Sequence, residues 1–453
     1  MDKLVKINGI INNFIWGPVM LVLLIGTGLY LTLRLKGFTL LRLGYIFKNT
    51  IMKMFKKDRE PEAGEGEITA FQALSTALAA TVGTGNIAGV STAIVRGGPG
   101  AVFWMWLSAL FGMATKFAEV VLSIEYRERT EDGRYVGGPM YYIKNGLNNK
   151  FLANVFAGLA ALAAFGIGNL VQSNAMAESL ETSFGLDRRI TGILVCILTG
   201  IIIIGGLKRI ANVTERLVPF MSAFYIIGGL LVILVNVREV PAAFKLIFQS
   251  AFTSDAAIGA FSGITVKMAM RYGMSRGVFS NEAGLGSAPI AHAAATTDHP
   301  VRQGLWGIFE VFVDTIIICT ITALTILVTG VIDSGESGVA LTTLAFEKGI
   351  SGLGGYIVTL GIMLFAFSTS ISWSFYGERS LEFLFGPKST KFYRIVWIPT
   401  IFVGAIGGLD LVWDIADTLN GLMAIPNLIG IIGLSSVVVR LTKEFFAREG
   451  IDY

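Results

Sequence analysis

The sequence predicts an all-α polytopic membrane protein, built from two inverted repeats of five spans with one extra N-terminal helix, about 11 transmembrane helices in all. Three observations support this fold class: an apolar composition, apolar runs long enough to cross a bilayer, and a similarity between the two halves of the chain. Of 453 residues, 53% are hydrophobic and 15% are charged, and the mean hydropathy is +0.67. Soluble domains average about 25% charged residues, so this composition indicates a chain embedded in a lipid bilayer.

The composition also excludes several classes of function. The two cysteines, Cys196 and Cys319, fall in apolar segments and indicate neither disulfides nor a metal site. The two histidines, His292 and His299, fall in an expected loop, which argues against a histidine proton relay. Nucleotide-binding loops, metal clusters and nucleophile elbows are absent from the sequence. We therefore expect no enzyme, and the net charge of +4 requires no nucleic-acid partner because basic cytoplasmic loops account for it.

Eleven segments are apolar and long enough to be membrane spans. The first of them lacks a small-residue cleavage site, so we expect a span and not a signal peptide. The predicted spans are residues 14–33, 69–95, 100–126, 151–180, 190–206, 211–236, 264–295, 301–331, 353–383, 392–408 and 410–440.

The Lys and Arg residues outside the spans are unevenly distributed. With the N-terminus outside, the inner segments hold 24 of these residues and the outer segments hold 8. Because cytoplasmic loops are enriched in Lys and Arg, we expect a multi-pass protein of the cell membrane with its N-terminus outside and its C-terminus in the cytoplasm.

The chain divides into three predicted parts: residues 1–67, 68–240 and 241–453. The first part contains the N-terminal span and a linker that is basic after Arg34 and acidic and Gly-rich from Glu60 to Glu67. We interpret its basic half as an amphipathic surface helix on anionic lipid; a solvated loop is the alternative.

The other two parts are the predicted repeats. Residues 85–94 resemble residues 280–290, and the sequence from Gln172 to Glu181 parallels that from Trp373 to Glu382. Because five spans is an odd number, the second copy enters the membrane from the opposite side, which makes the repeat inverted. Chance similarity of short Ala/Gly strings is the alternative. Three pairs fall in register: Asn86/Asn281, Ala88/Ala283 and Gly89/Gly284.

The run from Ala79 to Asn86 predicts a broken helix in the middle of the first repeat span. Gly83 and Gly85, separated by one Thr, each cost a helix about 1 kcal/mol relative to Ala. Backbone groups released at membrane depth are tolerated only where they line a protein cavity, as in the binding sites of secondary transporters. The released amides of Thr84 and Gly85 suit a carboxylate, and the released carbonyls suit a small cation. A Gly-rich helix-packing face is the alternative.

Residues 97–112, Gly-Gly-Pro-Gly-Ala-Val-Phe-Trp-Met-Trp-Leu-Ser-Ala-Leu-Phe-Gly, resemble the signature of the alanine or glycine:cation symporter (sodium:alanine symporter) family. Residues 81–89, 280–289 and 297–300 are also similar to that family. The resemblance covers nearly the whole chain. It implies the five-plus-five fold of the bacterial leucine transporter, and uptake of alanine and glycine driven by Na⁺ or H⁺.

The resemblance also implies a sodium site between the first and eighth repeat spans. Its oxygen donors would be the carbonyls of Ala79, Val82 and Ala366 and the hydroxyls of Thr369 and Ser370. Each span offers its donors on one helix face, and neutral hard oxygens suit Na⁺. Thr and Ser hydroxyls that bond their own helix are the alternative.

The substrate site is expected around the same break. The carboxylate would meet the amides of Thr84 and Gly85, beside Gly83 and Asn86, which has an alternative role in capping the outer half-helix. The remaining candidates are acceptors for the ammonium group and walls around the small side chain; ordinary bundle packing is the alternative for the aromatic ones. They are Thr81, Gln172 and the carbonyls from Gly277 to Ser280 as acceptors, and Phe165, Gly168, Phe279 and Trp373 around the pocket.

Ionisable residues inside the predicted spans need a partner or water. Arg276 and Glu282 flank the second break, which we place near residues 277–280 with Ser262–Gly263 as another possibility, and we predict a gating or structural ion pair between them. A proton-coupling carboxylate is the alternative to coupling by sodium alone. The other members of this group include Lys116, Glu119, Glu310 and Asp314.

Taken with the resemblance, these features predict a symporter for alanine and glycine that works by alternating access. The resemblance implies that spans one, two, six and seven rock against spans three, four, eight and nine. A transporter of another small solute, a channel and a membrane enzyme are the competing interpretations. No feature of the sequence indicates an oligomeric state.

Overall fold

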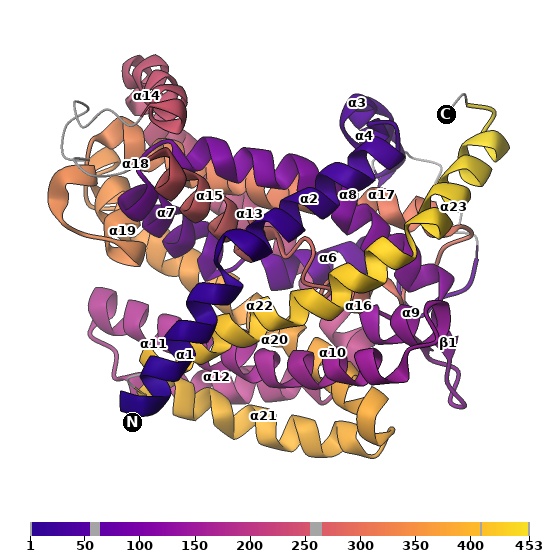
Figure 1. The fold of residues 1–453 in the computed structure, drawn as a ribbon. Helices are drawn as coiled ribbons and strands as arrows, with labels where there is room; N and C mark the ends of the chain where they lie inside the picture. The colour runs from indigo at the N-terminus through magenta and orange to yellow at the C-terminus, as the bar shows by residue number, and fades with distance from the viewer. Residues whose placement is uncertain (1, 55–63, 254–264, 408–409, 452–453) are drawn as a thin grey trace.

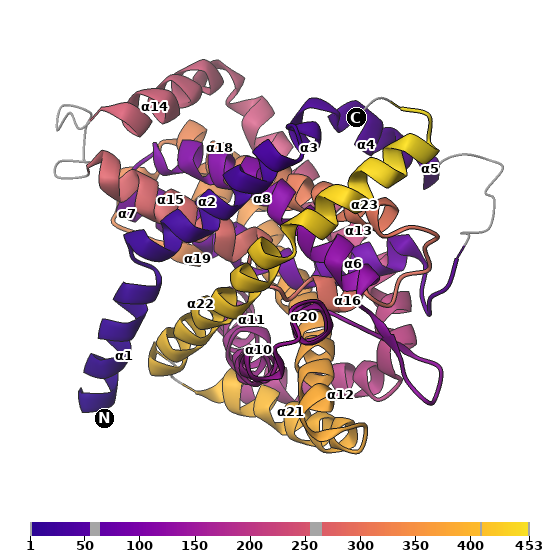
Figure 2. The same cartoon turned by 45° about the vertical axis from the view of Figure 1, so that its right-hand side comes forward.

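A computed structural model describes residues 2–54, 64–253, 265–407 and 410–451 (Figure 1). These residues are helical except for loops and one antiparallel hairpin of two short strands, β1 (Glu128–Arg129) and β2 (Tyr135–Val136). The N-terminus and α14 (Val240–Phe252) lie at one end of the molecule, while the hairpin and α5 (Ile51–Met54) lie at the other (Figures 1 and 2).

The N-terminal span is longer than predicted and is interrupted. It consists of α1 (Asp2–Ile15) and α2 (Pro18–Arg34), and the stretch from Lys6 to Arg34 is long and apolar enough to cross a bilayer. Pro18 begins α2 because its missing N–H is needed least in the first turn of a helix.

The predicted amphipathic helix of the linker is three short helices instead of one. They are α3 (Phe38–Leu41), α4 (Leu43–Asn49) and α5. Gly37 has a positive φ of 70°, and Arg42 and Thr50 leave helical geometry, so each turn ends before the next begins.

The part predicted as the first repeat begins with a broken span and continues with four more spans and two short connecting elements. Its elements are α6 (Ala70–Thr81), η1 (Gly85–Gly89) with α7 (Val90–Gly97), α8 (Ala101–Glu125), the hairpin, α9 (Pro139–Gly146), α10 (Lys150–Ala163) with η2 (Ala164–Leu170) and α11 (Val171–Phe184), α12 (Arg188–Ile203) and α13 (Gly206–Val235).

The part of the chain after α13 contains the remaining elements. After η3 (Val237–Glu239) and α14, it comprises α15 (Val266–Asn281), α16 (Pro289–His292), α17 (Pro300–Val311) with η4 (Phe312–Cys319) and α18 (Thr320–Thr329), η5 (Ile332–Ser334), α19 (Gly338–Gly349), α20 (Gly354–Phe385), α21 (Ser389–Ile406), α22 (Asp410–Gly433) and α23 (Ser435–Arg448).

The spans form two groups that meet around α6. Helices α8, α15 and α17 pack against one another in the upper half of Figure 1, and α10, α11, α12, α20 and α21 pack together in the lower half. Helix α6 contacts members of both groups, because it packs on α17 and on α20. A movement of α6 would therefore alter its packing against both groups of helices.

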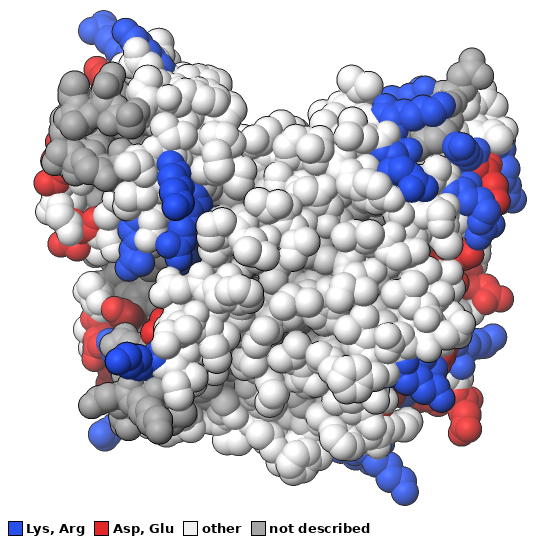
Figure 3. All heavy atoms as spheres, viewed as in Figure 1, with Lys and Arg blue, Asp and Glu red and all other residues white. Residues whose placement is uncertain are grey.

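The distribution of charge fits a protein that crosses a membrane. In Figure 3 the acidic and basic side chains gather at the two ends of the molecule and leave a broad uncharged belt between them. Within the described residues, seven helical stretches are long and apolar enough to span a bilayer, and the bent pair α6 with η1–α7 makes an eighth. The total of eleven spans stays a prediction.

Candidate functional site

The first break lies within the predicted run. Helix α6 ends at Thr81, Val82 is extended with φ −75° and ψ 90°, and the chain resumes at Gly85 in a direction bent by 52°. The Gly83 N–H, which would bond the Ala79 carbonyl in a continuous helix, donates to Asn86 Oδ1 at 2.9 Å. Asn86 therefore holds the break itself, and the outer segment starts as a π-helical turn without a side-chain cap.

Two released carbonyls of α6 face hydroxyls of α20. Ser368 Oγ donates to the Ala79 carbonyl at 3.2 Å, and Thr369 Oγ1 donates to the Ala80 carbonyl at 3.3 Å. The Ser370 oxygen is buried and has no hydrogen-bond partner in the part of the chain that the structure describes. The structure thus brings the predicted cation ligands of α6 and α20 side by side.

The pairing across this contact differs in detail from the predicted set. Ser368 and Ala80 were not among the predicted ligands, yet they make two of the observed contacts. Sequence spacing selects a helix face but not the angle at which α20 crosses α6, so the neighbouring hydroxyl of the Ser-Thr-Ser run was missed. Ala366, Thr369 and Ser370 are all buried.

A buried carboxylate stands next to the break. Asn86 Nδ2 donates to Asp314 Oδ1 at 2.7 Å and to Ser280 Oγ at 3.0 Å, and Ser280 Oγ donates to Asp314 Oδ2 at 2.8 Å. All three side chains are at most 1% exposed. The sequence had indicated Asp314 only as an intramembrane charge in need of a partner. The position of Asp314 inside a predicted span could have assigned this residue to the site, because intramembrane carboxylates usually mark functional sites.

The second break begins later than predicted. Helix α15 continues to Asn281, and the irregular stretch is 282–288, with positive φ at Glu282, Gly284 and Gly286. Gly277, Phe279 and Ser280 are therefore helical, which corrects the prediction of a break near 277–280. The alternative position at Ser262–Gly263 lies outside the described residues.

The carbonyls released at this break are those of Phe279 and Ser280. The amides that would bond them in a continuous helix go elsewhere, Ala283 N to Asn281 Oδ1 at 3.0 Å and Gly284 N to Glu119 Oε1 at 3.1 Å.

Gly277 does not contribute a released group. A Cβ at Gly277 would lie 2.3 Å from Ser108 Oγ, so this glycine permits close packing on α8.

Three of the predicted pocket residues meet next to α20. A Cβ at Gly168 would lie 2.1 Å from the Cβ of Trp373, so the two backbones are in close contact. Gln172 Nε2 donates to the Ile167 carbonyl at 2.9 Å, while its buried Oε1 has no partner among the described residues. Gln172 therefore offers an acceptor, as predicted for an ammonium group.

Two of the predicted site residues are engaged by neighbouring groups of the protein. The Phe165 ring packs on Tyr393 and Trp397 of α21, with centroids 4.9 and 5.3 Å away, and so belongs to the packing between α21 and η2. Thr81 Oγ1 bonds the Ala77 carbonyl of its own helix at 3.3 Å, because a threonine hydroxyl reaches the preceding turn easily.

A cavity of about 130 Å³ reaches the site from the end of the molecule that carries α1. Phe279 lines this cavity and also touches the break, since a Cβ at Gly85 would lie 3.4 Å from its ring. Arg276 lies over the Phe279 ring at 5.6 Å, whereas Glu282 accepts from Trp373 Nε1 at 3.1 Å. The predicted ion pair between Arg276 and Glu282 is therefore wrong for the described residues.

The opposite end of the site is closed by backbone contacts. Glu67 N donates to the Ala294 carbonyl at 2.8 Å, and Arg127 donates to the carbonyls of Ala293 and Ala295 at 3.0 and 2.8 Å. Burial raises the pKa of Glu67, an effect that the hydrogen bond from the Tyr135 N–H opposes. The cavity at Phe279 thus lies toward the α1 end, and these hydrogen bonds lie on the other side of the site.

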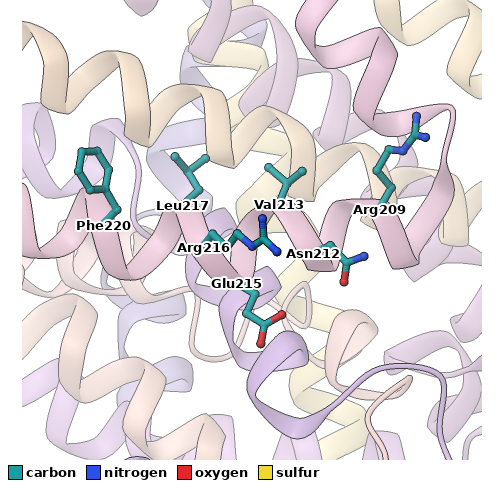
Figure 4. A pocket seen from close by; sticks show the side chains of 7 residues that line it. All are labelled: Arg209, Asn212, Val213, Glu215, Arg216, Leu217 and Phe220. Atoms are coloured by element: carbon teal, nitrogen blue, oxygen red, sulfur yellow. The ribbon is translucent and has the colours of Figure 1, made fainter.

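Another hollow, of about 700 Å³, lies on the outside of α13 (Figure 4). Its floor is one helix, and Glu215 on that helix accepts a bond from Gln72 of α6 at 3.0 Å. None of the residues at either break lines it, so it is not the candidate site. Its lining residues are Arg209, Asn212, Val213, Glu215, Arg216, Leu217 and Phe220.

The chain is similar to known proteins over almost its whole length. The sodium:alanine symporter family matches residues 1–451. The sodium/alanine symporter AgcS of Methanococcus maripaludis is 50% identical over 453 residues, with 98% of each chain covered. YrbD of Bacillus subtilis, a putative sodium/proton-dependent alanine carrier, is 37% identical over 462 residues, covering 98% of this chain and 93% of its own.

Among solved structures, a Na⁺-coupled sialic acid symporter in a substrate-bound outward-open state has a TM-score of 0.54. It is 13% identical and covers 96% of this chain and 93% of its own, so the likeness concerns the fold alone. The predicted leucine-transporter-like fold class is confirmed by this similarity.

Proposed function

Because the chain belongs to the sodium:alanine symporter family, we propose that it carries alanine and glycine into the cell together with Na⁺ by alternating access. Membership makes it a secondary transporter of the membrane and not an enzyme. The observation that supports the proposal most is the break between Thr81 and Gly85, whose released carbonyls face the hydroxyls of α20.

The sodium ion is assigned to the five oxygens inferred from the sequence: the carbonyls of Ala79, Val82 and Ala366 and the hydroxyls of Thr369 and Ser370. Two features support this assignment. The Ser370 oxygen is buried with no other partner among the described residues, and Thr369 already bonds a carbonyl at the end of α6. Neutral oxygen donors from two helices suit Na⁺, which would join α6 to α20 and so tie the two groups of helices together.

The amino acid is assigned to the space between the two breaks. Its carboxylate would meet the amides of Thr84 and Gly85 at the positive end of the outer half-helix. Its ammonium group would bond the Phe279 and Ser280 carbonyls and Gln172 Oε1, which lack helix partners. Its side chain would face Phe279, Gly168 and Trp373, and the tight approach of Gly168 to Trp373 favours a small side chain.

The transport direction follows from the predicted orientation. With the N-terminus outside, the cavity lined by Phe279 opens to the exterior and the contacts of Glu67 and Arg127 close the cytoplasmic side. The three-part division at residues 67 and 240 belongs to the same proposal, and it is supported by Asn86 and Asn281, which each bond a backbone amide at their own break.

The test is uptake of labelled alanine into proteoliposomes with and without an inward Na⁺ gradient. We expect concentrative uptake with the gradient, and a large loss of sodium stimulation in Thr369→Ala. Thr400→Ala is the matched control, because among the described residues Thr400 bonds its own helix alone, at the Val396 carbonyl. Unchanged sodium dependence in Thr369→Ala would remove this ion site, and non-saturable flux that never concentrates alanine would favour a channel.

A further inference from the structure

A buried cluster of charged residues surrounds the second break and takes no part in the proposed sodium site. It contains Lys116 and Glu119 on α8, Glu282 at the break, and Glu310 on α17. Lys116, Glu119 and Glu310 are fully buried and Glu282 is 4% exposed. Lys116 interacts electrostatically with all three carboxylates, so the four groups form one unit.

His292 lies between Gln303 and this unit. Gln303 Nε2 donates to the Ala70 carbonyl at 3.5 Å and also contacts His292 Nδ1 at 2.8 Å. His292 Nε2 hydrogen-bonds Glu310 Oε2 at 3.2 Å. One lysine thus faces three carboxylates, one of which also bonds the imidazole of His292.

Such an excess of negative charge is too costly to stay ionised away from water, so the unit must bind a positive species. No group of three His, Cys, Asp or Glu side chains in the described part of the chain is arranged to hold a metal ion. A proton meets this need, because a buried carboxylate binds one readily.

Glu119 is the carboxylate of this unit that has an oxygen without a hydrogen-bond donor among the described residues. Glu310 accepts from Lys116 Nζ at 3.0 Å and from His292, and Glu282 has a donor on each oxygen, Trp373 Nε1 and Ser287 Oγ. Glu119 Oε1 accepts from Gly284 N and Asn427 Nδ2, but its buried Oε2 has no partner among the described residues.

Two tyrosines and the carboxylate of Asp314, which interacts electrostatically with Glu310, also face the unit. Tyr142 on α9 faces Glu119, and Tyr376 on α20 faces Glu282 and Glu310.

We propose that Glu119 is a proton-binding residue and that its protonation is linked to the geometry of the second break. The link is direct, because the same carboxylate holds the Gly284 amide and the Asn427 side chain of α22. A charged acceptor forms the stronger hydrogen bonds, so gain of a proton loosens both contacts. The expected change in alanine binding depends on the proposed function. The presence of a proton on Glu119 does not depend on it.

The first experiment is infrared spectroscopy of the purified protein at neutral pH, which reports the carbonyl stretch of a protonated carboxylic acid. We expect this band in the wild type, its loss in Glu119→Gln, and its retention in Glu282→Gln and in the exposed control Glu131→Gln. A band that persists in Glu119→Gln, or that is absent from the wild type, overturns the proposal. If Glu119→Gln does not fold, Glu119→Asp keeps a carboxyl group and must shift the frequency of the band. An unshifted band in Glu119→Asp would also overturn the proposal.

The second experiment measures alanine binding at saturating Na⁺ across neutral and alkaline pH. We expect the dissociation constant of the wild type to change by about fivefold or more, the lower end of ordinary coupling, and that of Glu119→Gln to stay constant. Identical pH profiles for the two proteins overturn the linkage. If alanine does not bind at all, the proposed substrate is wrong, while the infrared band still decides whether Glu119 holds a proton.

Discussion

Substitution of Gly83 by alanine tests the sodium site most directly. A Cβ built on Gly83 lies 2.8 Å from Thr369 Oγ1, and the other Thr369 atoms are 3.8 Å away, so the hydroxyl alone is in conflict. Ordinary contacts to a Cβ begin at 3.4 Å. The hydroxyl would therefore have to retreat by 0.6 Å, the difference between these two distances, and it would leave the position proposed for a sodium ligand.

The size of the effect on sodium affinity depends on whether the ion-free or the ion-bound protein can relieve the steric conflict. In the ion-free protein Thr369 can turn away from the new methyl group, whereas the ion-bound protein needs its oxygen in place. Overpacking of this kind costs about 1–3 kcal/mol. If the cost falls on the bound state alone, the sodium concentration for half-maximal uptake rises by roughly 5- to 150-fold.

The assay is sodium-dependent alanine uptake into proteoliposomes, with Gly89→Ala as the matched control. A Cβ at Gly89 meets nothing within 4 Å, and Gly89 has helical φ and ψ, so this change affects only helix propensity in the same segment. We expect normal sodium dependence in Gly89→Ala. A Gly83→Ala protein with wild-type sodium dependence would refute the position assigned to the ion.

Three further substitutions probe the neighbouring contacts. Asn86→Ala removes the acceptor of the Gly83 amide and a donor to Asp314. Because each unpaired buried group costs about 1–3 kcal/mol, we expect a lower melting temperature. An unchanged melting curve would contradict this role of Asn86. Trp373→Ala enlarges the pocket and should admit larger amino acids in a competition panel; a spectrum confined to alanine and glycine would mean that another residue limits size. Gln172→Leu removes the side-chain oxygen Oε1, which has no partner among the described residues. The alanine dissociation constant should rise about tenfold or more, which is the loss expected for a hydrogen bond to a charged group. Calorimetry that finds the wild-type value would exclude this contact.

Local sequence was sufficient wherever the backbone itself is the functional feature. Gly83 and Gly85 weaken the helix whatever packs around them, so the first break could be predicted from the chain alone. The second break was predicted too early, because Gly277 also looks like a helix breaker. Its actual use is close packing on Ser108 of α8, and a contact with a distant helix leaves no local signal.

The same limit applies to the side chains around the site. Phe165 is an aromatic residue at the expected depth, but the rotation of η2 turns its ring toward Tyr393 and Trp397 of α21. Asp314 was recognised only as an intramembrane charge, because its partners Asn86 and Ser280 are 228 and 34 residues away in the sequence.

Sequence by itself determined that this protein is a bundle of membrane helices, that one helix comes apart at residues 82–84, and which family the chain resembles. These properties depend on hydrophobicity and backbone strain, which act within a few residues. Only the tertiary structure decided which hydroxyl of α20 meets which carbonyl of α6, and that Lys116 faces three carboxylates around the second break. Those contacts depend on the crossing angles and rotations of helices, which the packing of the whole bundle sets.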